Sequence, residues 1–87
     1  MTDRGGSRDQ IEIRVERVFR EVFEDPALVV GPNTTATDIP RWDSLEHINL
    51  IMALEAEFSV EFTSVEVTTM SRVGDLYPIL RGKLSQR

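Results

Sequence analysis

The sequence predicts a small, mainly helical domain, and three stretches with the apolar spacing of amphipathic helices lead to this prediction. They cover residues 9–24, 44–58 and 71–84. The chain has 87 residues, and its hydrophobic fraction of 40% is enough for a modest core. We therefore expect one domain over residues 9–84, with a fold dominated by packed helices.

Short polar segments flank this domain. Residues 1–8, with the sequence MTDRGGSR, are expected to form a flexible N-terminal tail, and residues 85–87 a C-terminal tail. No signal peptide is visible, and no apolar run approaches the roughly 20 residues that would cross a bilayer. These features predict a cytoplasmic monomer that does not bind membranes.

Composition narrows the possible functions. The net charge of −5 argues against nucleic acid as a partner, because phosphate binding needs a basic face. The absence of cysteine excludes disulfides and thiolate nucleophiles and fits a reducing compartment. A single histidine, His47, is too few for a histidine-based metal site, so we expect no metal. A partner with a basic patch fits the charge better.

The first helix is expected over residues 9–24. Its apolar residues recur at helical spacing, and most charged side chains lie outside their stripe. The helix should end near Glu24, because a proline at position 26 biases Asp25 away from helical geometry. The predicted stripe consists of Ile11, Val15, Val18, Phe19 and Val22.

Residues 25–43 form a long predicted loop with three prolines and a glycine. Loops of about nineteen residues exceed the usual connection and tend to be functional or disordered. We expect Trp42 to anchor this loop, with its N–H bonded locally. The apolar residues that indicate packing onto the domain are Leu28, Val29, Val30, Ile39 and Trp42.

The second helix is expected over residues 44–58. Asp43 is a suitable N-cap, and Glu46 stands three residues later, in the position of a capping-box acid. Glu46 also complements the positive end of the helix dipole.

Two apolar stripes run along opposite sides of this second helix. Leu50, Ile51, Leu54 and Phe58 form one stripe, which should face the core. The second stripe, which we call the outer stripe, consists of Leu45, Ile48 and Met52. A small domain cannot easily bury both sides of a helix, so we expect the outer stripe to be exposed and to bind partners. Glu46, Asn49 and Glu55 border it and are expected to take part in that binding.

The C-terminal third of the chain gives two patterns. Val60, Phe62, Val65 and Val67 alternate with polar residues, which by itself predicts an edge strand. The last helix should begin near Ser71 as N-cap, and Pro78 inside it predicts a kink or a shorter helix. The apolar stripe of this helix consists of Val73, Leu76, Tyr77, Leu80 and Leu84.

Residues 43–58, with the sequence DSLEHINLIMALEAEF, resemble the signature of acyl carrier proteins. In that family an Asp-Ser-Leu tripeptide opens the second of four helices, and the MALE stretch and the later Phe58 match in spacing. The resemblance extends from about Gln10 to Leu84, and it includes TTMSRVGDLYPIL near the last helix. It implies an all-α four-helix bundle of acyl-carrier type, with a long loop between helices 1 and 2. It also implies a short third helix in place of the strand.

The resemblance also implies a function and a cofactor. Ser44, between Asp43 and Leu45, would receive 4′-phosphopantetheine from coenzyme A through a phosphopantetheinyl transferase and Mg²⁺. The thiol of this arm would hold acyl groups as thioesters, and the protein would be a carrier and not an enzyme. Acyl-loading, condensing and acyl-transfer enzymes of fatty acid, polyketide or related pathways would be its partners. Their basic patches would meet Glu46, Glu55 and Glu57.

The sequence also departs from carriers of fatty acid synthesis. Asp38-Ile39-Pro40-Arg41-Trp42 replaces a glycine-containing Asp-Leu-Gly stretch. Asn49 replaces a usual acid, and His47 a small residue. The face is thus less acidic, which suggests a dedicated carrier for a specialised pathway such as polyketide, lipid or polysaccharide modification.

Several alternatives remain open at this point. Ser44 is also a common residue at an ordinary helix start, and the outer stripe could pack against the loop. A peptidyl or aminoacyl carrier is disfavoured, because those proteins usually have a Gly-Gly-His-Ser type sequence. An unmodified helical adaptor would use the outer stripe alone. A hydrolase with a Ser44–His47 pair is disfavoured, because the sequence lacks a nucleophile elbow and an orienting third group. The position of His47 on the core side of the second helix predicts a partly buried, satisfied histidine.

Overall fold

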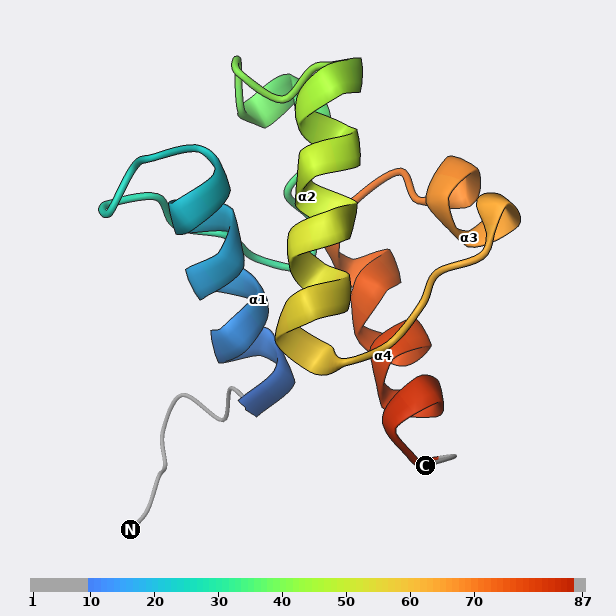
Figure 1. Ribbon diagram of the computed structural model, residues 1–87. Helices are drawn as coiled ribbons and strands as arrows, with labels where there is room; N and C mark the ends of the chain where they lie inside the picture. The colour runs from blue at the N-terminus through green and yellow to red at the C-terminus, as the bar shows by residue number, and fades with distance from the viewer. Residues whose placement is uncertain (1–9, 86–87) are drawn as a thin grey trace, which may run out of the picture.

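The computed structural model describes residues 10–85, and four α-helices of this segment pack around one core (Figure 1). They are α1 (Gln10–Val22), α2 (Ser44–Phe58), α3 (Ser64–Thr69) and α4 (Leu76–Ser85), with 3₁₀ turns at Ala36–Asp38 and Val73–Asp75. The predicted all-α bundle, with its long loop and short third helix, is confirmed.

The boundaries at the two ends differ slightly from the prediction. The expected N-terminal tail over residues 1–8 lies outside the described residues, as do residues 86–87. Ser85, which was expected in the C-terminal tail, is instead the last residue of α4. Across residues 10–85, no helix combines the length and the apolar character that crossing a bilayer requires.

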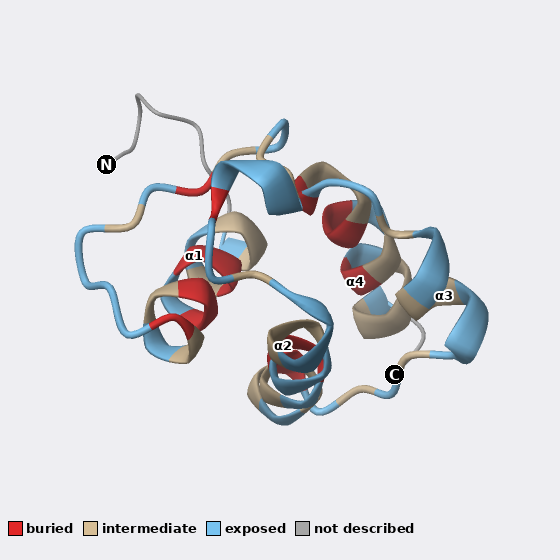
Figure 2. Ribbon diagram, turned by 90° about the horizontal axis from the view of Figure 1, so that it is seen from above, coloured by how far each residue is buried: buried red, intermediate tan, exposed pale blue. Residues whose placement is uncertain are grey.

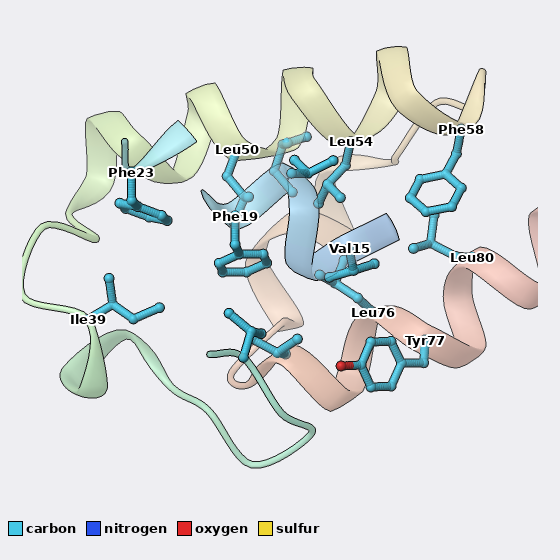
Figure 3. Packing of buried hydrophobic residues seen from close by; sticks show 14 residues of the cluster. Val15, Phe19, Phe23, Ile39, Leu50, Leu54, Phe58, Leu76, Tyr77 and Leu80 are labelled. Carbon is cyan, nitrogen blue, oxygen red and sulfur yellow. The ribbon is translucent and has the colours of Figure 1, made fainter. Parts of the chain in front are cut away.

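The core lies between α1, α2 and α4. The predicted core stripe of α2 is confirmed, because all four of its residues are buried. Figure 3 shows Phe19 of α1 directly below Leu50 of α2, and Phe58 above Leu80 of α4. The residues with the most fully buried side chains are Phe19, Phe23, Phe58, Leu50, Leu54, Leu76, Leu80, Val15 and Val73.

Helix α1 ends at Val22, two residues before the predicted end. Glu24 adopts left-handed backbone geometry with φ of 54°, and the N–H of Asp25 donates to the carbonyl of Arg20 at 3.0 Å. This is the Schellman type of helix end, so the reversal at Glu24 stops the helix before the proline does. Phe23, which the predicted stripe omits, is buried directly after the last turn.

A buried carboxylate fixes the first part of the long loop. Glu16 of α1 accepts a hydrogen bond from the N–H of Val30 at 2.9 Å, and it pairs with Arg20 at 3.4 Å. Arg20 in turn donates to the carbonyl of Leu28 at 2.7 Å. These contacts turn Val30 inward and leave Val29 75% exposed, so the prediction that Val29 packs onto the domain is wrong.

The middle of the loop is joined to the segment before α4. The N–H of Gly74 donates to the carbonyl of Pro32 at 2.8 Å, and the N–H of Val73 donates to Thr34 at 2.9 Å. Thr35 and Arg72 form an isolated antiparallel bridge beside them. The loop is therefore held by α1 on one side and by the segment before α4 on the other.

Helix α3 replaces the edge strand that the alternating pattern predicts. Thr63 and Glu66 form a reciprocal capping box, with N–H to oxygen distances of 2.9 and 3.1 Å. Such a box stabilises the first turn of even a short helix. Val67 of α3 is half-buried and Val65 is 68% exposed. The strand prediction is wrong because local capping outweighs the β-branched composition.

Helix α4 begins at Leu76 and not near Ser71. The carboxylate of Asp75 accepts hydrogen bonds from the N–H groups of Ser71 and Arg72, at 2.9 and 3.2 Å, so Ser71 is not the N-cap. Pro78 is the third residue of α4, in the first turn, where an N–H would have no acceptor within the helix. Of the two expected effects of Pro78, the shorter helix is the one observed.

Two glycines provide a matched test of this packing. A Cβ at Gly74 would lie 2.6 Å from the carbonyl oxygen of Pro32, whereas at Gly82 in α4 it would meet nothing within 4 Å. We expect Gly74→Ala to destabilise the domain by about 1–3 kcal/mol through overpacking. Gly82→Ala should stabilise it by about 0.5–1 kcal/mol through helix propensity. Urea denaturation of both variants checks the prediction, and equal effects would contradict it.

Candidate functional site

Ser44 is the first residue of α2, and it lies exposed at the end of that helix. The carboxylate of Asp43 caps the helix by accepting the N–H of Glu46 at 2.9 Å. Asp43 therefore performs the capping, and the Ser44 hydroxyl has no hydrogen bond among the described residues. The serine is free for another role at an end where the helix dipole favours a negative group.

The predicted capping box of α2 is only half present. The N–H of Asp43 donates to the carbonyl of Arg41 at 3.1 Å and so does not need the Glu46 carboxylate. Glu46 instead accepts a hydrogen bond from the side-chain amide of Asn49 at 3.3 Å. Both side chains thus remain on the outer surface of α2.

A cavity of about 490 Å³ opens beside Ser44. It lies between the 3₁₀ turn at Ala36–Asp38, the N-terminal end of α2 and the segment that runs from α3 toward α4. The side chains around it are partly apolar and partly hydroxyl-bearing. Its lining residues are Ala36, Trp42, Asp43, Ser44, His47, Val67, Thr68, Met70 and Ser71.

Trp42 and His47 form one wall of this cavity. The indole N–H of Trp42 donates to Nδ1 of His47 at 3.1 Å, and the two rings stack with centroids 5.9 Å apart. Nε2 of His47 lies 3.3 Å from the carbonyl oxygen of Val67. Because an indole N–H can only donate, Nδ1 accepts, and the neutral ring donates from Nε2 to Val67.

These contacts test the predictions made for Trp42 and for His47. Trp42 is the locally bonded loop anchor that the sequence predicts, and its ring packs edge-on against Phe19 with centroids 5.3 Å apart. His47 is half-buried, and both of its ring nitrogens have partners, as predicted. Since neither nitrogen is free to take a proton from Ser44, the geometry gives no support to a serine–histidine pair.

The outer stripe of α2 is exposed, as the helical periodicity predicts. Leu45, Ile48 and Met52 are 66%, 55% and 62% accessible to solvent. Figure 2, which views the molecule from above, shows buried residues of α2 turned toward the bundle and exposed residues on its outward side. An apolar surface of this kind on a small domain is typical of a contact surface.

Two acids of α2 have internal partners that the sequence does not reveal. Glu55, at the border of the outer stripe, accepts the N–H of Phe62 at 2.9 Å and so fixes the chain after the helix. Glu57 pairs with Arg14 of α1 at 2.7 Å, so it faces the bundle and not the outer surface. The expectation that Glu57 meets a partner's basic patch stays a prediction, and the ion pair with Arg14 competes with such a contact.

Helix α3, which forms part of the cavity wall, is held to α4 by an ion pair. Glu66 contacts Nζ of Lys83 at 2.9 Å, and this ammonium group also lies 5.6 Å from the centre of the Phe62 ring. The N–H of Thr63, followed by the Lys83 contact, lowers the pKa of Glu66 below its ordinary value of 4.5. The N–H groups of Ser71 and Arg72 likewise lower the pKa of Asp75 below 3.8.

Comparison with known proteins connects this geometry to a family. No protein-family model matches the chain. A curated acyl carrier protein from Thermosynechococcus vestitus is 38% identical over 68 residues, which are 78% of this chain and 83% of the relative. The chain belongs to the acyl carrier protein family. An acyl carrier protein from Rickettsia typhi is 28% identical over 88% of this chain and 90% of its own.

A solved structure supports the same assignment. The solution structure of holo acyl carrier protein from Geobacter metallireducens has a TM-score of 0.81 and 37% sequence identity, with 86% of each chain covered. The chain is thus an acyl carrier protein by fold as well as by sequence, and a carrier rather than an enzyme. Membership of this family implies a phosphopantetheine arm.

The sequence did not predict the charged residues whose contacts hold the segments around this site. Glu16, Lys83 and Arg14 each hold a segment that surrounds the cavity or α2, yet each is a charged residue in an amphipathic pattern. Nothing in the sequence distinguishes Lys83 and Arg14 from solvated residues. The only available signal was the placement of Glu16 next to Val15, on the margin of the buried stripe.

The lowered pKa of Glu66 predicts a pH effect on stability. Because the folded state favours the ionised carboxylate, its contribution is complete above the ordinary pKa of 4.5 and is lost as the pH falls through the lowered pKa. Glu66→Gln should therefore reduce the loss of Tm between pH 5 and pH 3. Thermal denaturation at both pH values tests this, with Glu61→Gln, at an exposed position, as control. Identical acid profiles for Glu66→Gln and the unmodified protein would contradict it.

Proposed function

We propose that this protein carries acyl groups as thioesters on a 4′-phosphopantetheine arm attached to Ser44. The observation that carries the proposal is the exposed, unbonded hydroxyl of Ser44 beside a capping residue, Asp43, that already fixes the helix end. A serine needed only as a cap would use its own oxygen for that purpose. The arm would supply a thiol, which the chain itself lacks because it has no cysteine.

The loading reaction follows from this position. The Ser44 oxygen attacks the phosphorus of coenzyme A next to the pantetheine, an O–P bond forms, and the pyrophosphate bond breaks with release of adenosine 3′,5′-bisphosphate. The hydroxyl proton passes to a base on the transferase or to water. In the product, the phosphodiester carries a negative charge at the N-terminal end of α2, where the helix dipole and free N–H groups are favourable.

Ser44 and the outer stripe support a role in delivery to enzymes. Leu45 follows the serine directly, and Ile48 and Met52 continue the apolar surface for two turns. Methionine suits a surface that must meet several partners in turn, because its side chain adapts to different contacts. We assign binding of the phosphopantetheinyl transferase and of acyl-loading, condensing and acyl-transfer enzymes to this stripe, with Glu46, Asn49 and Glu55 at its border.

A specialised pathway fits this surface better than general fatty acid synthesis. Asn49 is neutral and Glu57 pairs with Arg14 of α1, so Glu46 and Glu55 are the two acids that remain at the border. Such a border would select enzymes with a correspondingly weak basic patch. Full substitution for the carrier of fatty acid synthesis, with those enzymes, would contradict this assignment.

Attachment to Ser44 predicts a specific change of mass. Incubation with coenzyme A, Mg²⁺ and a promiscuous phosphopantetheinyl transferase should add one phosphopantetheinyl group, measured by intact-protein mass spectrometry. Ser44→Ala should abolish the gain, whereas Ser71→Ala, in the wall of the same cavity, should retain it. No gain on the folded protein would instead support an unmodified adaptor that binds through the outer stripe.

A second prediction tests the outer stripe. Ile48→Asp should slow loading by about tenfold, because an aspartate there removes an apolar contact and adds a charge that must be desolvated. Val29→Asp, at a 75% exposed position of the long loop, serves as the matched control and should load at the unmodified rate. Circular dichroism should show unchanged helix content in both. Equal loading rates of the two variants would show that the stripe does not contact the transferase.

A further inference from the structure

The basic residues of this chain are almost all arginines. Nine of its ten basic side chains belong to Arg, and Lys83 is the one lysine. A guanidinium group stays protonated in proteins, whereas a lysine amine can lose its proton and act as a nucleophile. Lys83 therefore carries the one side-chain amine of the sequence, which also has no thiol of its own.

Two side chains contact the amine of Lys83. Its Nζ lies 2.9 Å from a carboxylate oxygen of Glu66 in α3 and 5.6 Å from the centre of the Phe62 ring. The Lys83 side chain is 20% exposed, against 34% for Arg14 and 47% for Arg81, which also form ion pairs. The one lysine is thus less accessible to solvent than these arginines.

The position of Glu66 is fixed before Lys83 meets it. The carboxylate oxygen that contacts Nζ also accepts the N–H of Thr63 at 2.9 Å, within the capping box of α3. A carboxylate held in this way loses less side-chain entropy when it pairs with an ammonium group. Nζ can react with a bulky reagent only in the fraction of molecules in which it has moved away from Glu66.

An accessible amine is a liability beside thioesters, because thioesters acylate amines. The uncharged nitrogen attacks the carbonyl carbon, a C–N bond forms, the C–S bond breaks, and the thiol leaves with the proton released by nitrogen. The amide product has no charge. On Lys83 it would remove the ion pair to Glu66 and the attraction to the Phe62 ring, and with them a link between α3 and α4.

We propose that Glu66 and Phe62 shield the one lysine of this chain from acyl transfer, so that a protein which carries thioesters is not itself acylated. This inference rests on the proposed function, because a carrier of acyl groups meets thioesters throughout its cycle. The shield lies apart from the attachment site, since none of Phe62, Glu66 and Lys83 lines the cavity beside Ser44.

The test compares Lys83 with an amine at an open position. Arg17 is exposed on α1 and has no ion pair or hydrogen bond within residues 10–85, so Arg17→Lys introduces an unshielded amine. This variant, combined with Ser44→Ala, is incubated with acetyl-coenzyme A, and peptide mapping by mass spectrometry times amide formation. Lys83 should react about tenfold more slowly than the introduced amine, because only the fraction with a released Nζ reacts. In concentrated urea the two rates should become equal.

A second variant separates the ion pair from the helix cap. In Glu66→Gln the side-chain oxygen can still accept the N–H of Thr63, but the charge that holds Nζ is gone. In the same background it should raise the rate at Lys83 about fivefold and leave the introduced amine unchanged. Glu61→Gln, at an exposed position, is the matched control and should change neither rate. Circular dichroism should show the same helix content in all variants.

A thioester on the arm is tested separately from one in solution. Arg17→Lys with Ser44 intact is loaded from acetyl-coenzyme A by a transferase and freed of the reagent. After incubation, hydroxylamine removes the remaining thioesters and leaves the amides. Lys83 should again react about tenfold more slowly than the introduced amine. Faster reaction of Lys83 would show that the arm delivers acyl groups to it, and would overturn the shield.

The remaining outcomes are separable. Equal rates at the two amines of the folded protein would overturn the shield, and so would a rate at Lys83 that does not change in folded Glu66→Gln. The proposed function would stand in both cases, because loading of Ser44 is measured independently. Failure of loading would overturn the proposed function and the reason for a shield, whereas the rates in the Ser44→Ala background would still report how far Lys83 is protected.

Discussion

The position of Ser44 depends on how the long loop is held against α1. Glu16 accepts the N–H of Val30, and Arg20 donates to the carbonyl of Leu28, so the start of the loop cannot leave the helix without loss of both hydrogen bonds. At the far end, Trp42 packs on Phe19, and Asp43 follows as the cap of α2. The loop thereby fixes where α2 begins and which way its first residue faces.

Helix α2 then serves two purposes with one sequence. Its inner side supplies Leu50, Leu54 and Phe58 to the core, and its outer side leaves an apolar stripe in water. An exposed apolar stripe lowers solubility unless another surface covers it part of the time. Helix α2 therefore combines a side that is fixed in the core with an apolar stripe that stays exposed to solvent.

The parts that depend on local pattern could be predicted from the sequence. The helical spacing identified α2, its cap Asp43, the buried side and the exposed stripe, and the resemblance to acyl carrier proteins corrected the strand to the short helix α3. The internal partners of Glu16, Glu55 and Glu57 could not be predicted. An acid on a helix looks the same in sequence whether it faces solvent or a neighbouring segment, and its partners are distant in the chain.

The internal use of the α2 acids has a consequence for association with enzymes. Glu57 is paired with Arg14, whereas Glu46 and Glu55 accept only neutral N–H donors and keep their negative charges beside Leu45, Ile48 and Met52. Dissolved salt screens the long-range attraction between charged surfaces, with a Debye length of about 8 Å at physiological ionic strength. Association with an enzyme that offers a basic patch to this surface should consequently slow as salt is added, while the apolar stripe determines the fit after contact.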